Sequence, residues 1–154
     1  MASAAAASGL DLDISPGVCP NSLDLKSQGV LDIAILGSED LDVKTVDAAN
    51  ATLARGGWEG RLKPLYWNYE DVAAPMVGEG ESACPCHQAG QDGFEDLILK
   101  FDIYFMIKNL ELQAVAGQDI LLNLTVPLQA AGGALGEQRE GRECLKIVLS
   151  EVRP

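Results

Sequence analysis

The chain has 154 residues, 47% of them hydrophobic and 22% charged, which is enough to bury the core of one domain and unlike the composition of a disordered protein. Its 23 acidic and 11 basic residues give a formal net charge of −12, a sign that repels nucleic-acid phosphates and anionic lipids and favours solubility. No run approaches the roughly 18–20 apolar residues needed to cross a bilayer, so we expect neither a nucleic-acid partner nor membrane insertion.

Residues 1–9 form an Ala-rich N-terminal tail, and we expect residues 10–154 to form a single domain. The tail lacks the basic and apolar regions of a signal peptide, although its Ala-x-Ala spacing fits the remainder of a cleaved one. An artificial start to the chain would have the same composition.

Alternating or continuous apolar runs between turn residues predict β-strands along most of the chain. The expected strands cover residues 10–14, 29–37, 41–47, 61–67, 95–107, 119–128 and 143–152. The first has Leu10, Leu12 and Ile14 on one face, and the second is an apolar run between two glycines, typical of a strand buried on both faces. Pro64 weakens the fourth strand, and the fifth is too long for one flat strand, which predicts a bend near Asp102.

The helical signal is confined to a short turn within residues 46–57, with Asp47 as N-cap and Gly56 as C-cap. About seven to nine strands separated by polar turns predict an all-β fold, an antiparallel β-sandwich.

The stretch ISPGVCPNSLDLKSQGVLDIAILGSEDLDVKTVDAANATLA, residues 14–54, resembles an accessory β-sandwich-like domain that recurs in secreted, modular proteins of bacteria. The similarity continues more loosely through residues 69–72, 92–101 and 141–148. Asp32 stands where that family commonly has proline, and Leu41 where it has phenylalanine. The resemblance implies an extracellular or cell-surface module that lies beside other modules, and it implies no reaction.

The family often has a calcium-loop pattern, Asp-x-Asn-x-Asp-Gly-x-x-Asp, before the strand that corresponds to residues 95–107. Here Asp92, Gly93 and Asp96 match the end of that pattern, whereas Gln88 and Gly90 replace its first two oxygen ligands. Calcium takes six to eight oxygen ligands, so this loop by itself is not a complete site.

A calcium site therefore needs Asp92 and Asp96 together with distant carboxylates such as Glu70 and Asp71. The alternative is a tight turn whose backbone is capped by the aspartate side chains.

Four cysteines and one histidine leave two further interpretations open. Cys84, Cys86 and His87 place three potential zinc ligands within four residues, and Cys19 or Cys144 would have to supply the fourth. In an oxidising compartment the four cysteines form disulfides instead, either Cys19 with Cys144 or a crossed pairing with Cys84 and Cys86.

The sequence contains no recognisable catalytic motif, and adjacent carboxylates in a chain this acidic arise by chance, so we expect no enzyme activity. Trp58, Trp67 and Tyr69 are candidates for a carbohydrate-binding platform if their rings are exposed. In residues 65–69, Tyr66 lies on one strand face, and Trp67 and Tyr69 lie on the other, so at least one face is expected in the core.

The sequence therefore predicts a non-catalytic, extracellular structural or adhesion module. It also allows a self-assembling surface or filament subunit, a homo-oligomer in which residues 4–14 add a strand to a neighbour's sheet. The alternative is an accessory module that binds a ligand, either carbohydrate or calcium.

Overall fold

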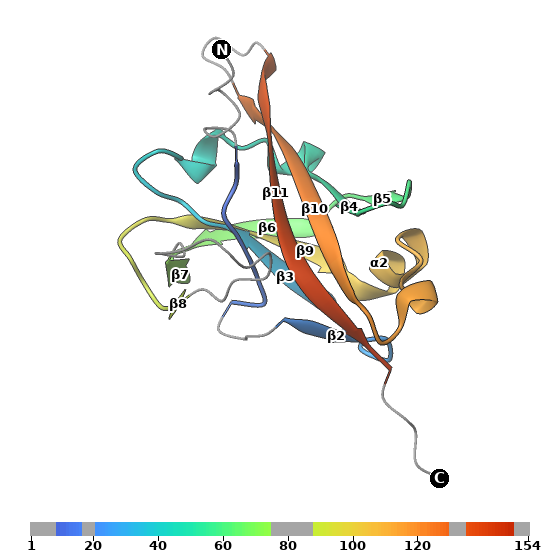
Figure 1. Ribbon diagram of the computed structural model, residues 1–154. Helices are drawn as coiled ribbons and strands as arrows, with labels where there is room; N and C mark the ends of the chain where they lie inside the picture. Colours follow the sequence, from blue (N-terminus) through green and yellow to red (C-terminus); the bar gives the residue numbers. More distant parts are fainter. Residues whose placement is uncertain (1–8, 17–20, 75–87, 130–134, 150–154) are drawn as a thin grey trace.

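The computed structural model describes residues 9–16, 21–74, 88–129 and 135–149, and these form a sandwich of two β-sheets with one short α-helix at its side (Figure 1). The predicted all-β sandwich is confirmed. Within the described residues, no helix is long and apolar enough to cross a membrane.

The two sheets contain four and five strands. The first has the order β1 (Leu12–Ile14), β3 (Val30–Ile35), β9 (Asp96–Asp102) and β6 (Tyr66–Glu70). The second has the order β2 (Ser22–Asp24), β11 (Leu135–Val148), β10 (Asp119–Gln129), β4 (Thr52–Arg55) and β5 (Arg61–Leu62). Neighbouring strands are antiparallel except β2 and β11, which run parallel. A separate pair joins β7 (Ala73–Ala74) to β8 (Gln88–Ala89).

The core lies between the two sheets and is built by strand alternation. On β9, Leu97, Leu99 and Phe101 are each 0% exposed and belong to the same apolar cluster as Leu122 and Leu124 of β10. Burying a side chain of this size contributes about 1.5–3 kcal/mol, so these positions hold the sheets together.

The N-terminal segment contacts both sheets of its own sandwich. β1 pairs with β3, and just before it the backbone N–H of Leu10 donates to the carbonyl of Glu140 on β11 (3.0 Å). Leu10, Leu12 and Ile14 are buried as the alternation predicts. A Cβ atom added at Gly141 would lie 2.8 Å from the Leu10 Cβ, so glycine is what allows this close packing.

The long segment 95–107 breaks at Asp102 as predicted, but its second half is a helix and not a strand. The Asp102 side chain accepts a hydrogen bond from the Phe105 N–H (3.2 Å) and so caps α2 (Ile103–Asn109). Ile103 and Met106 are buried, so helical packing outweighs the strand propensity of this aromatic, β-branched stretch. The 3₁₀ turn η3 (Leu112–Val115) follows.

The strand predicted at residues 41–47 is also wrong, because this segment forms the 3₁₀ turn η1 (Val43–Thr45). The Asp42 side chain accepts from the Lys44 N–H (3.0 Å), which stabilises a turn in competition with a strand ladder.

The predicted helical turn after Asp47 exists, but it ends earlier than expected. It forms η2 (Ala48–Asn50), Ala51 and not Gly56 is its C-cap, and Asp47 makes no side-chain capping bond. The chain then enters β4, where Leu53 pairs with Leu124 of β10, so sheet pairing takes the residues that the helix would have needed.

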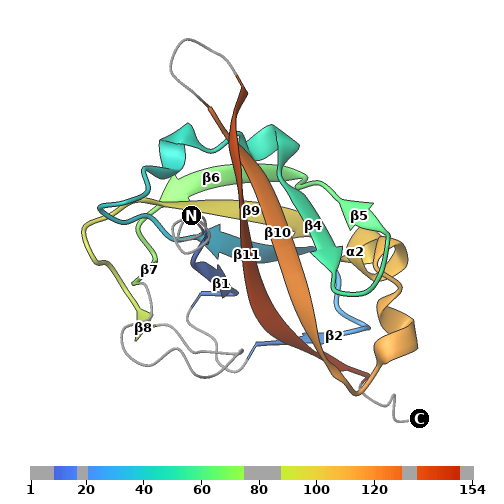
Figure 2. The ribbon, with the colours of Figure 1, turned by 45° about the horizontal axis from the view of Figure 1, so that its top comes forward.

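Residues 61–67 divide at Pro64 into β5 and β6, which belong to different sheets. Proline lacks the N–H that a continuous ladder would require. The last strand begins earlier than predicted, at Leu135, because β11 pairs with β10 along nearly its whole length. In Figure 2 these two strands cross in front of β3, β9 and β6.

Candidate functional site

The carboxylates proposed for calcium hold the backbone of the β6–β9 corner. Asp96 is 0% exposed, and its two oxygens accept hydrogen bonds from the backbone N–H groups of Gly37 and Val72, both at 2.9 Å. Asp96 therefore joins the segment after β3 to the segment after β6. A buried carboxylate that accepts two backbone donors is a structural anchor of the sheet.

Asp71 serves the loop that leads into β9. Its oxygens accept from the N–H groups of Asp92 (3.1 Å) and Gly93 (2.8 Å), and Asp92 in turn accepts from the Phe94 N–H (2.9 Å). Gly93 has a φ of 91°, the left-handed conformation that favours glycine. This is the aspartate-capped turn that the sequence left open as an alternative to calcium.

Glu70 ends β6 in register with Asp96, and its side chain is exposed. Across the described ranges, no three histidine, cysteine, aspartate or glutamate side chains gather closely enough to hold a metal ion. The calcium prediction stays a prediction, and the candidate zinc ligands Cys84, Cys86 and His87 lie outside the described residues.

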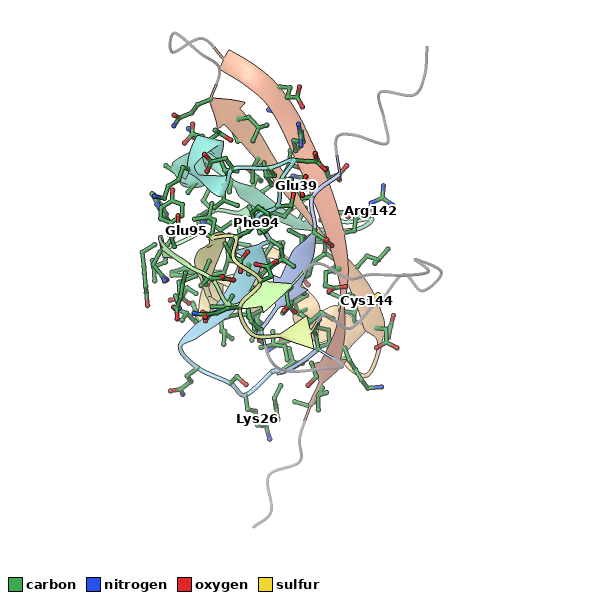
Figure 3. All side chains as sticks on the ribbon, turned by 90° about the vertical axis from the view of Figure 1, so that its left-hand side faces the viewer. Lys26, Glu39, Phe94, Glu95, Arg142 and Cys144 are labelled. Carbon is green, nitrogen blue, oxygen red and sulfur yellow. The ribbon has the colours of Figure 1, made fainter. Side chains whose placement is uncertain are left out.

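Cys144 lies on the outward side of β11, between the buried Glu143 and Leu145, and it is disulfide-bonded. Figure 3 places Cys144 and Arg142 on β11, with Phe94 and Glu95 across the molecule in the loop before β9. Because the other three cysteines lie outside the described residues, the pairing stays a prediction. Cys144 is in the middle of its strand and not, as predicted, at the start.

The three candidate carbohydrate-platform residues lie in different elements: Trp58 contacts α2, and Trp67 and Tyr69 lie on β6. The Trp58 Nε1–H donates to the Asn109 carbonyl at the end of α2 (3.0 Å), and the Arg55 guanidinium lies 5.2 Å from the Trp58 ring centre. Trp58 thus attaches the β4–β5 loop to α2. Trp67 and Tyr69 share one face of β6, where Trp67 pairs with Leu99 and Tyr69 with Leu97.

Strand β6 is the most exposed strand of the first sheet. It pairs with β9 on one side, and among the described residues no strand pairs with its other side (Figure 2). Leu65, Tyr66 and Trp67 are 57%, 51% and 38% exposed, whereas Tyr69 is half-buried below the Lys44 ammonium. An unpaired strand edge with aromatic side chains is a surface for adding a further strand.

Two further surface features were not expected from the sequence. On α2, Tyr104 and Phe105 are 65% and 47% exposed and pack edge to face at 5.2 Å. On the outer face of the second sheet, a hollow of about 290 Å³ is lined by Asn123, Thr125 and Gln138 among other polar side chains. The only local sequence signal for the start of α2 is Asp102, a residue type that commonly caps helix N-termini. The hollow has no local signal, because it needs three strands to be aligned.

Comparison with known proteins gives one distant structural likeness. No family model matches the chain, and no curated protein is significantly similar in sequence. The structure is similar to that of AggA, the major subunit of aggregative adherence fimbriae type I from Escherichia coli, with a TM-score of 0.36 and 13% sequence identity. The alignment covers 90% of this chain and 94% of that one. A likeness at this level carries no assignment of function.

Proposed function

We propose that the chain is a non-catalytic structural or adhesion module of an extracellular protein, and that it works by binding another protein through the open side of β6. The observation that carries the proposal is the unpaired edge of β6, where Leu65, Tyr66 and Trp67 are exposed together. Aromatic side chains beside unpaired backbone groups provide both the apolar contact and the hydrogen bonds of strand addition.

Two further observations support this function. Asp71, Asp92 and Asp96 accept hydrogen bonds from backbone N–H groups, so their carboxylates serve the fold of the corner. The disulfide bond of Cys144 fits an oxidising, extracellular compartment, where such bonds persist.

Part of the N-terminal segment that the sequence suggested for strand addition, residues 4–14, is used within this chain. Residues 10–14 pair with β3 and β11 of the same chain, so in this arrangement they are not available to a neighbour's sheet. We therefore place strand addition at the β6 edge and not at residues 10–14.

Adherence of the chain displayed on a bacterial surface tests the function. Displaying cells are applied to immobilised matrix proteins, to a glycan array and to each other, with undisplayed cells as the reference. We expect adherence to a protein surface that is reduced roughly tenfold by the double substitution Y66S/W67S, because interface aromatics carry much of the binding energy.

The control for this experiment is Q113S, which changes an exposed residue of η3 far from β6 in the chain. Circular dichroism establishes that each variant is folded. Absence of adherence to protein surfaces, or adherence that Y66S/W67S leaves unchanged, would contradict the proposed function.

A second candidate function is carbohydrate binding in the hollow over the five-stranded sheet. The observation that favours it is the polar lining of this hollow, where Asn123, Thr125 and Gln138 carry side chains of the kind that hydrogen-bond sugar hydroxyls. Binding on the glycan array that N123A removes and Y66S/W67S preserves would assign the ligand to this hollow.

A further inference from the structure

We propose that two copies of the chain associate through β6, paired edge to edge and antiparallel, so that their four-stranded sheets join into one continuous sheet. The inference rests on the proposed function in that it uses the same strand, and it goes further by naming the partner as a second copy. It follows from three properties of β6: its free length, its pairing chemistry and its symmetry.

β6 offers the longest of the four terminal strands in the two large sheets. The others are β1 and β2, with three residues each, and β5, with two, whereas β6 has five. β1 is also held at its N-terminal end by the Leu10–Glu140 hydrogen bond. Added strands gain affinity from main-chain hydrogen bonds, so the longest free edge is the favoured one.

The side chains of β6 complement themselves when two copies pair about Asn68. In that register Trp67 of one copy faces Tyr69 of the other, and Tyr66 faces Glu70, so the dimer contains each pair twice. Trp67 and Tyr69 share one strand face and form an aromatic cross-strand pair. On the opposite face, the Tyr66 hydroxyl can donate to the Glu70 carboxylate.

The same register agrees with the backbone geometry. Alternate residues of an edge strand point their N–H and C=O groups away from the sheet. The facing residues are Asn68 with itself, Trp67 with Tyr69 and Tyr66 with Glu70, and each pair is separated by an even number of positions. In each pair, the backbone N–H and C=O groups of both residues therefore point either away from their own sheets or toward them. Every residue whose backbone groups point outward faces a residue of the other copy whose groups also point outward.

The symmetry of the contact limits the size of the assembly. The same strand is used on both sides, so the interface has a two-fold axis and closes at two copies. Each chain carries a net charge of −12, so the copies repel each other at long range. Added salt screens this repulsion, and the dimer is expected to strengthen as ionic strength rises.

Charge substitutions at Asn68 test the dimer directly. The Asn68 side chain is exposed and makes no hydrogen bond to another described residue, so its replacement leaves the monomer intact. N68D and N68K each place two like charges face to face at the centre of the contact, and each is expected to weaken association roughly tenfold or more. An equimolar mixture of N68D and N68K brings opposite charges together and is expected to recover the dimer.

Sedimentation velocity over roughly 1 µM to 1 mM, the affinity range of a small interface, measures the result. We expect a concentration-dependent monomer–dimer equilibrium for the unmodified chain that shifts toward dimer in high salt. Q113D and Q113K, which make the same charge changes on η3, are the matched controls and should behave like the unmodified chain.

Each other outcome overturns the dimer. A chain that stays monomeric throughout, open-ended polymers, N68D and N68K variants that still dimerise, or a mixture that fails to recover the dimer would each contradict β6 pairing about Asn68. A monomer that nevertheless adheres to other proteins through Tyr66 and Trp67 would refute the dimer alone and leave the proposed function standing.

Discussion

The two edges of the four-stranded sheet are treated differently by the same chain. At the β1 edge, Leu12 and Ile14 are buried, and the preceding residue Leu10 is hydrogen-bonded to β11. At the β6 edge, Tyr66 and Trp67 are about half and more than a third exposed, and no described strand pairs beyond them. Proteins commonly protect the edges of their sheets. In this chain the β1 side chains are buried and the N-terminal end of β1 is bound to β11, whereas the described part of the chain provides no partner strand for the outer side of β6. We propose that this second edge is the one used for recognition.

The largest predicted loss of stability comes from replacing Asp96, which anchors the segment that follows β6. Asp96→Ala leaves the buried N–H of Gly37 and the partly buried N–H of Val72 without these acceptors, and we expect it to lower the free energy of unfolding by about 3 kcal/mol. Urea unfolding at neutral pH measures the loss. Asp92→Ala removes only one exposed loop hydrogen bond and should cost about 1 kcal/mol or less. Equal losses in the two variants would show that Asp96 is not the anchor.

The second prediction concerns the β1 edge, where Gly141 lets the N-terminal segment pack against β11. Gly141→Val places a Cβ within 2.9 Å of the Leu10 carbonyl oxygen and of the Leu12 Cγ, so it should displace the N-terminal segment and cost about 2 kcal/mol, in the range of overpacked cores. Hydrogen exchange should then increase in β1. Gly9→Val is the matched control, because a Cβ at that position meets nothing within 4 Å. Unchanged protection of β1 in Gly141→Val would show that this edge is closed by something other than the packing at Gly141.

The sequence predicted the individual strands of the four-stranded sheet better than their order in it. The apolar runs correctly located β3, β9 and β10, because buried strands are rich in apolar residues and this can be read from the local sequence. The alternation of Tyr66 against Trp67 and Tyr69 was correct for the same reason. β6 is a terminal strand because it pairs with β9, about thirty residues later in the chain. Such a pairing leaves no signal in the local sequence, so the order of the strands could not be predicted.

The errors have the same physical origin. The first half of β11, residues 135–142, is polar and Gly-containing, and it is a strand because it pairs with β10. Asp96 was predicted only as a calcium ligand, which stays a prediction; its role as acceptor for Gly37 and Val72 has no local signal, because these residues are 59 and 24 positions away in sequence. α2 was missed because seven residues are too few for a helical period to emerge against strand-forming side chains.

The smallest predicted effect tests whether the open edge is held by anything besides β9. The Lys44 ammonium lies 5.0 Å from the centre of the Tyr69 ring and 3.3 Å from the Glu95 carboxylate, and both charged side chains are about half exposed. Solvent weakens such contacts, so Lys44→Ala should lower the free energy of unfolding by at most about 0.5 kcal/mol. Lys26→Ala, which removes the same charge from the exposed turn between β2 and β3 (Figure 3), is the reference for the change in net charge. Because the strand ladder and the Asp96 anchor already fix β6, a loss similar to that of Lys26→Ala would mean that its outer surface adds little to the fold. A loss above about 1 kcal/mol would make Lys44 a structural clamp on Tyr69. In that case part of the apparently open edge would be committed to the stability of the monomer, and its aromatic side chains would be less available to a partner.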